Sequence, residues 1–186
     1  MSRNHFHSDW HFNHDFVART RGFETSAEHD EAVIDAINST VTKRDHLWVL
    51  GDVFMGSVSK GLEKIARVEG VKHLVLGNHD AAHPMHRKSH SQVRRFLEVF
   101  ESVHLHEQVF VAGQKVLLSH FPFEGDHKDT DRHLEWRLRD TGMPLVHGHV
   151  HKEWRTRGRQ FNAGVDHHLK PVTDGEVEAW LKGLEA

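Results

Sequence analysis

The chain contains four short apolar runs, and each leads directly into a block of glycine and polar residues. The runs at 47–50, 74–76, 116–118 and 145–146 precede Gly51-Asp52, Gly77-Asn78-His79-Asp80, Ser119-His120 and, through His147, Gly148-His149-Val150-His151. Apolar runs of this length with such boundaries are typical of buried strands. The polar blocks therefore stand at strand ends, and in open α/β sheets that edge is where ligands bind. This pattern predicts an α/β protein with one polar site.

Length and composition limit the remaining possibilities. With 186 residues, 37% hydrophobic and 27% charged, we expect a single domain over residues 1–186. No apolar stretch approaches the roughly 20 residues of a membrane helix, and the polar start resembles no secretory signal. We therefore expect a cytoplasmic protein without a membrane partner. A formal charge of −3 argues against nucleic acid as a partner, and the oligomeric state stays open.

Histidine is over-represented, with 21 residues, while tyrosine and cysteine are absent. The lack of cysteine excludes disulfides and thiolate ligands. Four histidines lie in these polar blocks, and a fifth, His11, lies in the further block Asp9-Trp10-His11. The other 16 are dispersed rather than gathered in a tract, which argues against metal storage and predicts surface or turn positions for most of them.

Periodicity predicts alternating helices and strands. Helices are expected at Ser26–Val41, at Ser59–Glu69, over Val93–Phe100, around Leu134 and Leu138, and after the capping box Thr173-Asp174-Gly175-Glu176. Beyond the runs named above, hairpins are expected at 109–118 and at 154–162. The first half is βαβ-like and the second half hairpin-rich. Together they predict one α/β domain with a mixed sheet or two packed sheets.

A further short block, Asp9-Trp10-His11, completes a set suited to metal ions. On an extended strand, residues two apart share a face, so Asp9 and His11 could reach one ion. Asp52 follows a glycine at a strand end, where its carboxylate can bridge two cations. Oxygen and imidazole donors without sulfur suit hard or borderline divalent metals. Seven donors are about right for two ions that share one carboxylate. Paired metal ions of this kind activate water for attack on phosphoesters. The seven donors are Asp9, His11, Asp52, Asn78, His120, His149 and His151.

Each block alone is a common turn or cap, but the ordered series carries a resemblance. Asp-x-His, Gly-Asp, Gly-Asn-His-Asp, His and Gly-His-x-His resemble the signature of the calcineurin-like metallophosphoesterase superfamily, matched over residues 9–151. Segments 6–14 and 161–166 also resemble small bacterial and phage members. Asn13 departs from the glycine often found there, and a tyrosine common near the site is missing. The resemblance implies a four-layer α/β/β/α sandwich of two mixed sheets flanked by helices.

The resemblance also implies a role for each donor. The first metal would be held by Asp9, His11, Asp52 and His151, and the second by Asp52, Asn78, His120 and His149. Asp52 would bridge the two ions. His79 would stand beside the leaving-group oxygen as general acid, and Asp80 would orient His79.

The expected activity is phosphoester hydrolysis by a hydroxide that bridges two divalent ions. Manganese is favoured, with iron, zinc or nickel as alternatives. The expected substrate is a small molecule, most simply a small or nucleotide phosphodiester, with phosphomonoesters and pyrophosphates as alternatives. His14 and Arg155 are the candidate substrate contacts, although both could be plain surface residues. A metal-binding interaction scaffold and metal sequestration are the non-enzyme alternatives.

Overall fold

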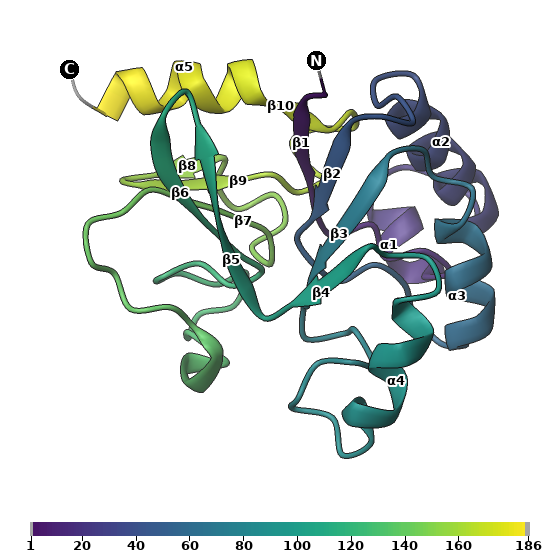
Figure 1. Ribbon diagram of the computed structural model, residues 1–186. Helices are drawn as coiled ribbons and strands as arrows, with labels where there is room; N and C mark the ends of the chain where they lie inside the picture. The colour runs from purple at the N-terminus through teal and green to yellow at the C-terminus, as the bar shows by residue number, and fades with distance from the viewer. Residues whose placement is uncertain (1, 185–186) are drawn as a thin grey trace.

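Two five-stranded sheets make up the protein, which we describe from a computed structural model over residues 2–184 (Figure 1). The first sheet has the order β10-β1-β2-β3-β4. Its strands are β1 (Asn4–His7), β2 (His46–Val49), β3 (Val71–Val75), β4 (Ser102–His104) and β10 (Val172–Thr173). Strands β1 to β4 are parallel, and β10 runs antiparallel to β1.

Four helices connect the parallel strands and cover the outer face of this sheet, on the right in Figure 1. They are α1 (Asp15–Thr20), α2 (Ser26–Asn38), α3 (Val58–Ile65) and α4 (Ser89–Phe96). Their apolar faces meet the sheet in a buried cluster that includes Trp10, Val33, Ile37, Leu47, Leu74 and Phe96. No helix within residues 2–184 has both the length and the apolar character needed to cross a membrane.

The second sheet has the order β5-β6-β7-β9-β8. Its strands are β5 (His106–Val111), β6 (Gln114–Ser119), β7 (Leu145–His147), β8 (Thr156–Arg157) and β9 (Gln160–Asn162). Strands β6, β7 and β9 are parallel, whereas β5 and β8 are antiparallel to their neighbours. A second buried cluster joins both sheets to α5 (Asp174–Leu184), with Phe6, Val116, Val146, Phe161, Val177 and Leu181.

Most of the predicted elements are confirmed. The α/β class, the two mixed sheets with flanking helices and both hairpins are present. The predicted capping box also forms, since Thr173 N donates to Glu176 Oε2 at 2.9 Å and Glu176 N donates to Thr173 Oγ1 at 3.3 Å. Strands β1, β4 and β10 and helix α1 were not predicted, because they are too short for a period to emerge.

The predicted helix around Leu134 and Leu138 is wrong. Only a 3₁₀ turn forms there, over Leu134–Trp136, and the Leu134 side chain is exposed. His133, which precedes it, has a left-handed backbone with φ of 57°. Arg137 then fixes the loop through hydrogen bonds from its guanidinium to the carbonyls of Arg132 and Gly125. The conformation of this segment is therefore set by local hydrogen bonds and not by burial of an apolar helix face.

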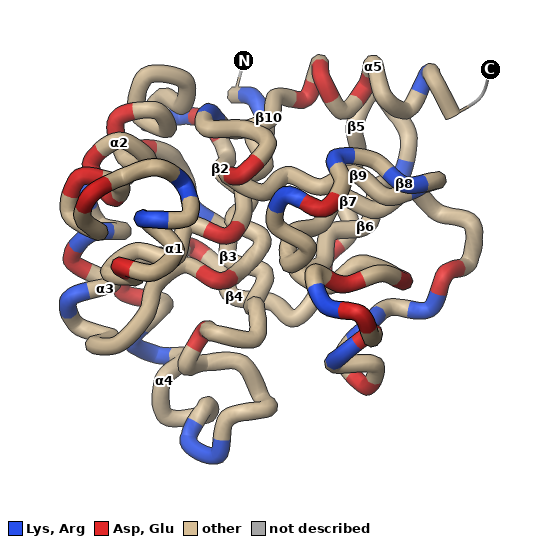
Figure 2. The backbone as a smooth tube through the Cα atoms, turned by 180° about the vertical axis from the view of Figure 1, so that it is seen from behind, with Lys and Arg blue, Asp and Glu red and all other residues tan. Residues whose placement is uncertain are grey.

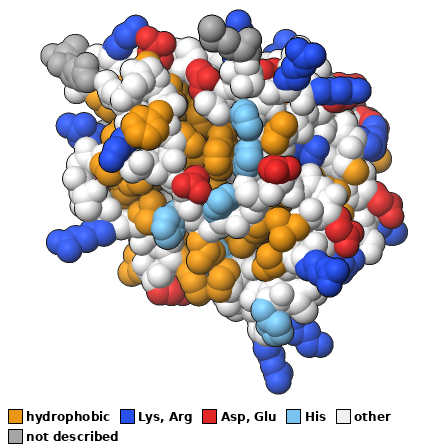
Figure 3. Space-filling model, in the orientation of Figure 1, with side chains coloured by type: hydrophobic (Ala, Val, Ile, Leu, Met, Phe, Trp, Pro, Cys, Tyr) orange, Lys and Arg blue, Asp and Glu red, His pale blue; other side chains and the backbone are white. Residues whose placement is uncertain are grey.

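The prediction of surface or turn positions for most of the 16 other histidines is confirmed only in part, because five of them, His5, His7, His29, His83 and His147, are buried. Among them only His86, His90 and His106 are exposed, and the remaining 13 are partly or fully buried. On the face shown in Figure 3, some histidine side chains border hydrophobic ones, and one at the bottom of the view lies beside Lys and Arg side chains. The buried imidazoles are packed parts of the fold.

Candidate metal centre

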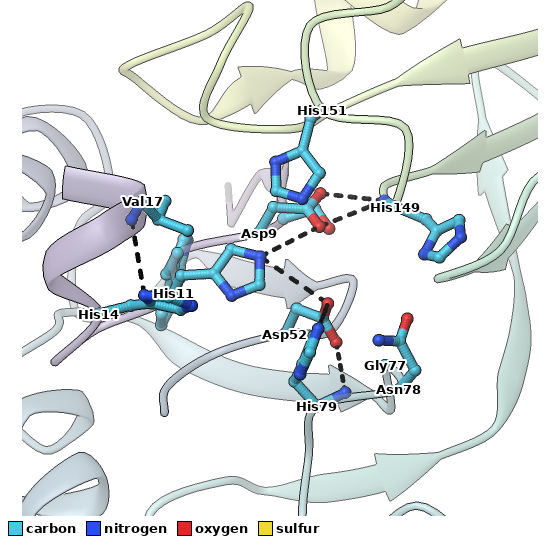
Figure 4. A network of polar contacts seen from close by, with 12 residues as sticks. Asp9, His11, His14, Val17, Asp52, Gly77, Asn78, His79, His149 and His151 are labelled. Atoms are coloured by element: carbon cyan, nitrogen blue, oxygen red, sulfur yellow. Dashed lines mark hydrogen bonds and ion pairs between the residues drawn. The ribbon is translucent and has the colours of Figure 1, made fainter. Parts of the chain in front are cut away.

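Six loops meet where the two sheets come together. They follow the parallel strands β1, β2 and β3 of the first sheet and β6, β7 and β9 of the second. Ser8 after β1 pairs with Gly164 after β9, which links the sheets at this edge. The backbone N–H of His149 donates to both carboxylate oxygens of Asp9, at 3.2 and 3.1 Å. Side chains from both sheets therefore face a common space (Figure 4).

Left-handed backbone conformations are concentrated at this edge. Eight non-glycine residues within 2–184 have positive φ, and five of them are predicted ligands: Asp9, His11, Asp52, His149 and His151. Such conformations are strained for residues with a Cβ and gather at functional sites. The expected extended strand at Asp9 and His11 is therefore wrong. The side chains still separate into two sets, because Trp10 and Phe12 belong to the hydrophobic core, whereas Asp9 and His11 belong to one group of possible metal donors.

Three glycines in the predicted blocks allow the loops to approach each other. A Cβ at Gly51 would lie 2.7 Å from the Cα of Gly77, and one at Gly77 would lie 2.7 Å from the backbone nitrogen of Asp52. A Cβ at Gly148 would collide with Ser8 Oγ and lie 2.5 Å from Asp9 Oδ2. Each glycine is needed for steric reasons, because any side chain there would push the ligand loops apart.

One group of donors could hold a metal ion at the α1 side of the space. Asp9, His11 and His151 each offer an atom, and these atoms lie within 4.8 Å of one another. His11 Nε2 also lies 3.8 Å from Asp52 Oδ2. Both ring nitrogens of His11 are buried without a hydrogen-bond partner, which is costly for polar atoms. A cation at this position would satisfy one of them.

A second group lies beside the first. Asp9, Asp52 and His120 offer atoms within 4.8 Å of one another. His120 Nε2 is 3.6 Å from Asp52 Oδ2 and 3.2 Å from Asn78 Oδ1. His149 Nδ1 lies 3.3 Å from His120 Nε2. All seven predicted ligands are thus brought together. Both groups include Asp9, whereas Asp52 was the expected shared carboxylate.

Hydrogen bonds on the far side of the rings fix three imidazoles. His120 Nδ1 is 2.8 Å from the carbonyl oxygen of Leu50. His149 Nε2 is 3.1 Å from Asp126 Oδ2, and His151 Nδ1 is 3.1 Å from Asp166 Oδ2. Each partner can accept the ring proton and so direct the other nitrogen to the common space. Such outer partners commonly orient metal-binding histidines.

Burial dominates the electrostatics of the centre. It lowers the pKa of His11 well below the ordinary value and also lowers that of His120. Burial, followed by the charge of Asp9, raises the pKa of Asp52 well above its usual range. In His151 burial is outweighed by the hydrogen bond to Asp166 and the charge of Asp9, which raise its pKa. The imidazoles of His11 and His120 and the two crowded buried carboxylates form a donor set that a divalent cation would stabilise, since buried charge needs a partner.

Asp126 and Asp166 were missed by the sequence analysis. Asp166 accepts two hydrogen bonds from Arg21, at 3.1 and 2.7 Å, and also contacts His151. Asp126 could form a third metal group with His127 and His149. However, the buried carboxylate of Asp126 already forms ion pairs with Arg132 at 2.8 Å and with Arg137 at 3.2 Å. A role in orienting the His149 ring therefore fits Asp126 better than direct metal binding. Neither aspartate follows an apolar run at once, so the strand-end pattern could not find them.

The structure places His79 at the centre and gives Asp80 a different role from the expected one. The His79 side chain is 43% exposed, with Nε2 at 3.9 Å from Asp52 Oδ2. Burial, followed by the neighbouring His120, lowers its pKa to about 4. The oxygens of Asp80 accept the backbone N–H groups of Gly77, Asp52 and Val53, at 2.7 to 3.0 Å. Asp80 therefore positions the ligand loops, and its predicted orientation of the His79 ring is not seen.

A cavity of about 330 Å³ opens over the centre. Among its lining residues are His14, His79, Lys128, Arg132 and Lys152, together with several of the predicted ligands. His14 thus lies where a substrate contact was expected. The prediction for Arg155 is not supported, because its guanidinium lies over the ring of Phe161, 5.9 Å from the centroid, and it does not line this cavity. The sequence analysis missed Lys128, Arg132 and Lys152.

Fold and centre define an α/β protein of two mixed sheets with an aspartate and histidine cluster at their common edge. The same fold occurs in a solved structure of a protein of unknown function from Aquifex aeolicus, with a TM-score of 0.74 at 23% identity over 97% of this chain and 100% of that one. No protein-family profile matches the chain.

Two curated relatives are mycobacteriophage proteins. The chain is 38% identical over 192 aligned positions to the Gene 66 protein of Mycobacterium phage L5, covering 95% of this chain and 93% of the relative. It is 35% identical over 199 positions to the Gene 66 protein of Mycobacterium phage D29, covering 100% and 98%. The chain belongs to the family of these Gene 66 proteins.

Proposed function

We propose that this protein is a phosphoester hydrolase of the calcineurin-like metallophosphoesterase kind, which uses two divalent metal ions. The fold proposed with it is the four-layer α/β/β/α sandwich of that superfamily. One observation carries the proposal. Seven oxygen and nitrogen donors from separate loops converge at one edge, and three imidazoles are held by outer hydrogen bonds that direct their second nitrogen inward.

The donor set fits two ions. Asp9, His11, Asp52 and His151 would hold one, and Asp52, Asn78, His120 and His149 the other. Two such ions, of which manganese is favoured, would activate water and neutralise charge on the phosphate oxygens. Asp9 lies close to both donor groups, so it is a second candidate for a shared carboxylate.

The protein's own residues would bind the phosphate and supply a proton. Lys128, Arg132 and Lys152 line the cavity and favour an anionic substrate. His79 projects from the loop after β3 beside Asp52 (Figure 4). A bound phosphate would raise the pKa of this imidazole, because a nearby negative charge favours the protonated form. His79 could then donate its proton to the leaving-group oxygen as the phosphorus–oxygen bond breaks.

A phosphodiester is the favoured substrate. His79 borders the cavity on one side and an open groove on the other, so substituents on two sides of the phosphorus have room. Phosphomonoester and pyrophosphate hydrolysis at the same site are the alternatives. A metal-binding interaction scaffold is the alternative outside enzymes.

Turnover of aryl phosphomonoesters and phosphodiesters with Mn²⁺, Ni²⁺, Zn²⁺ and Mg²⁺ tests the proposal directly. We expect the diester to be hydrolysed faster, with Mn²⁺ the best metal. Two tightly bound ions without turnover of either substrate would favour the scaffold. No bound metal and no turnover would refute both.

His79→Ala separates metal binding from catalysis. The variant should keep its metal ions, since His79 is not among the proposed ligands, and should lose about 10²–10⁴-fold in rate, the usual range for an acid–base group. His90→Ala, at an exposed histidine of α4, is the matched control and should retain full rate. Unchanged turnover in His79→Ala would remove this residue from the mechanism.

A further inference from the structure

A second hollow lies on the far side of His79 from the proposed metal centre. It is a groove of about 450 Å³ between the start of α3, the loop after β3 and helix α4. Its walls include Ser59, His79, His86, Lys88 and Arg95. His79 lines both this groove and the cavity over the metal centre. The imidazole therefore stands at the boundary between the two spaces.

The groove is positively charged and has no acidic counterpart. Lys88 and Arg95 line it, and no aspartate or glutamate is among its lining residues. Figure 2 shows basic positions on and beside α4, where these side chains originate. Arg95 is held toward the wall by hydrogen bonds to Ser59 Oγ at 2.8 Å and Gln92 Oε1 at 3.1 Å. Neither bond neutralises its charge, so the guanidinium can still attract an anion.

The groove is also connected to the centre through its backbone. His86 Nε2 lies 2.9 Å from the carbonyl oxygen of Asn78, a proposed metal ligand. The backbone N–H of His79, one residue further, donates to Asp52 Oδ1 at 2.8 Å. The loop after β3 thus supplies the proposed metal ligand Asn78, the proposed proton donor His79 and one wall of the groove. A group that leaves past His79 would enter this groove.

We infer that the groove binds the leaving group of the substrate and that this leaving group carries a second anion, such as a phosphate or phosphonate. The inference rests on the proposed hydrolase function. Water would add to the phosphorus, the bond to the leaving-group oxygen would break, and His79 would protonate that oxygen. Lys88 and Arg95 would hold the additional anion throughout.

Two aryl diesters with an unambiguous leaving group test the inference on the full chain loaded with Mn²⁺. Methyl phenyl phosphate releases phenol, whereas methyl 4-phosphonophenyl phosphate releases a phenol that bears a second anion. We expect at least a tenfold higher kcat/KM for the phosphono substrate, mainly through a lower KM. Lys88→Gln and Arg95→Gln should each remove most of that preference by raising KM for the phosphono substrate, with a much smaller effect on methyl phenyl phosphate, whose leaving group carries no second anion.

Arg94→Gln is the matched control, because Arg94 is the exposed neighbour on α4 and does not line the groove. It should keep the full preference. Since Arg95 also has structural hydrogen bonds, a thermal melt of each variant accompanies the kinetics, and Lys88, which is exposed, gives an independent variant. Turnover of both substrates with equal kcat/KM would overturn the inference alone. No turnover of either substrate, or of bis(4-nitrophenyl) phosphate, would overturn the proposed function.

Discussion

At the residue scale, the centre depends on backbone that ordinary side chains avoid. Five proposed ligands have positive φ, and three glycines let their loops touch. Left-handed residues cost roughly 1–3 kcal/mol each and persist only when surrounding contacts impose them. Such contacts are present here. The backbone N–H groups of Asp9 and His11 donate to the carbonyl oxygens of Gly51 and Asp52, at 3.0 and 2.9 Å. The two ligand loops hold each other in place.

Gly148→Ala should disrupt the centre. Its new methyl would collide with Ser8 Oγ and crowd Asp9 Oδ2, so we expect a loss of about 1–3 kcal/mol in the free energy of unfolding and weaker metal binding. Gly183→Ala is the control, because it lies in α5 with no atom within 4 Å, and alanine there should stabilise by up to about 1 kcal/mol. Thermal melts and Mn²⁺ titration measure both. Equal behaviour of the two variants would contradict the steric argument.

Asp126→Asn tests the orientation of His149. The amide keeps the shape but loses the charge that accepts the imidazole proton and pairs with Arg132, so metal affinity should fall about 10–100-fold. Asp129→Asn, at an exposed aspartate in the same loop, should bind metal as the unchanged protein does. Isothermal titration with Mn²⁺ gives both affinities. An Asp126→Asn protein with unaltered affinity would leave the carboxylate without an orienting role.

At the element scale, one carboxylate ties the start of β1 to the turn before β2. Asp45 Oδ2 accepts hydrogen bonds from the N–H and hydroxyl of Thr42, at 2.9 and 2.7 Å, and Oδ1 accepts from the N–H of Arg3 at 2.9 Å. The hydrogen bonds from Thr42 are the main cause that lowers the pKa of Asp45 to about 2. The ionised form therefore stabilises the junction of the first two strands.

The stability that Asp45 contributes should depend on pH. Since its pKa is lower in the folded state than the ordinary 3.8, the contribution is complete above about pH 5 and is lost as the pH falls from about 4 to about 2. Asp45→Asn should cost about 1–2 kcal/mol at pH 7. Urea unfolding at pH 7, 4 and 3 should show the gap between the two proteins narrowing. A gap that stays constant to pH 3 would contradict the lowered pKa.

Elements with a clear period could be predicted from the sequence, and elements fixed by tertiary contacts could not. Helix α2 and the hairpin β5–β6 follow their apolar patterns closely. The segment at Leu134 also has helical spacing, but the guanidinium of Arg137 binds the loop carbonyls and keeps it open. Strand β4 has only three residues and needs β3 as its partner.

The same distinction applies to the candidate site. The seven donors could be found because each stands in a short block with a recognisable spacing, and all but one of the blocks follow apolar runs. Asp126 could not be found from the sequence, because it lies in a loop whose course depends on its contacts with Arg132 and Arg137. The role of Asp80 was misjudged because sequence adjacency to His79 says nothing about where a carboxylate points. Its actual partners are the backbone N–H groups of Asp52 and Val53, in the loop after β2, and of Gly77 in its own loop.

At the scale of the whole molecule, the proposed centre joins the two sheets. Loops of the first sheet supply Asp9, His11, Asp52 and Asn78, and loops of the second supply His120, His149 and His151. Direct links between the sheets at this edge include the pairing of Ser8 with Gly164 and the bonds from His149 to Asp9. Burial, followed by the charge of the neighbouring Asp9, raises the pKa of Asp52 at this edge, and a bound cation would offset both effects.

Metal binding should therefore stabilise the entire fold and not only the loops. An ion that binds only the folded chain adds about 2.7 kcal/mol at a free concentration 100 times its Kd. For a chain of this length each kcal/mol corresponds to about 2–4 °C in Tm, so each occupied site should raise Tm by about 5–11 °C. Melts of protein treated with a chelator, and then reloaded with Mn²⁺, measure the change.

A variant of Asp52, the carboxylate proposed to bridge the two ions, makes that measurement specific. Asp52→Asn should lose most of the increase in Tm with Mn²⁺, because Asp52 lies within 3.8 Å of imidazole nitrogens in both donor groups. Without metal it should melt at or above the temperature of the chelated parent, since one of two repelling buried charges is gone. Asp174→Asn, at the first residue of α5 and far in sequence from the ligand loops, should keep the full response to Mn²⁺. If Asp52→Asn kept that response as well, the ions would not be bound between the two sheets at this carboxylate.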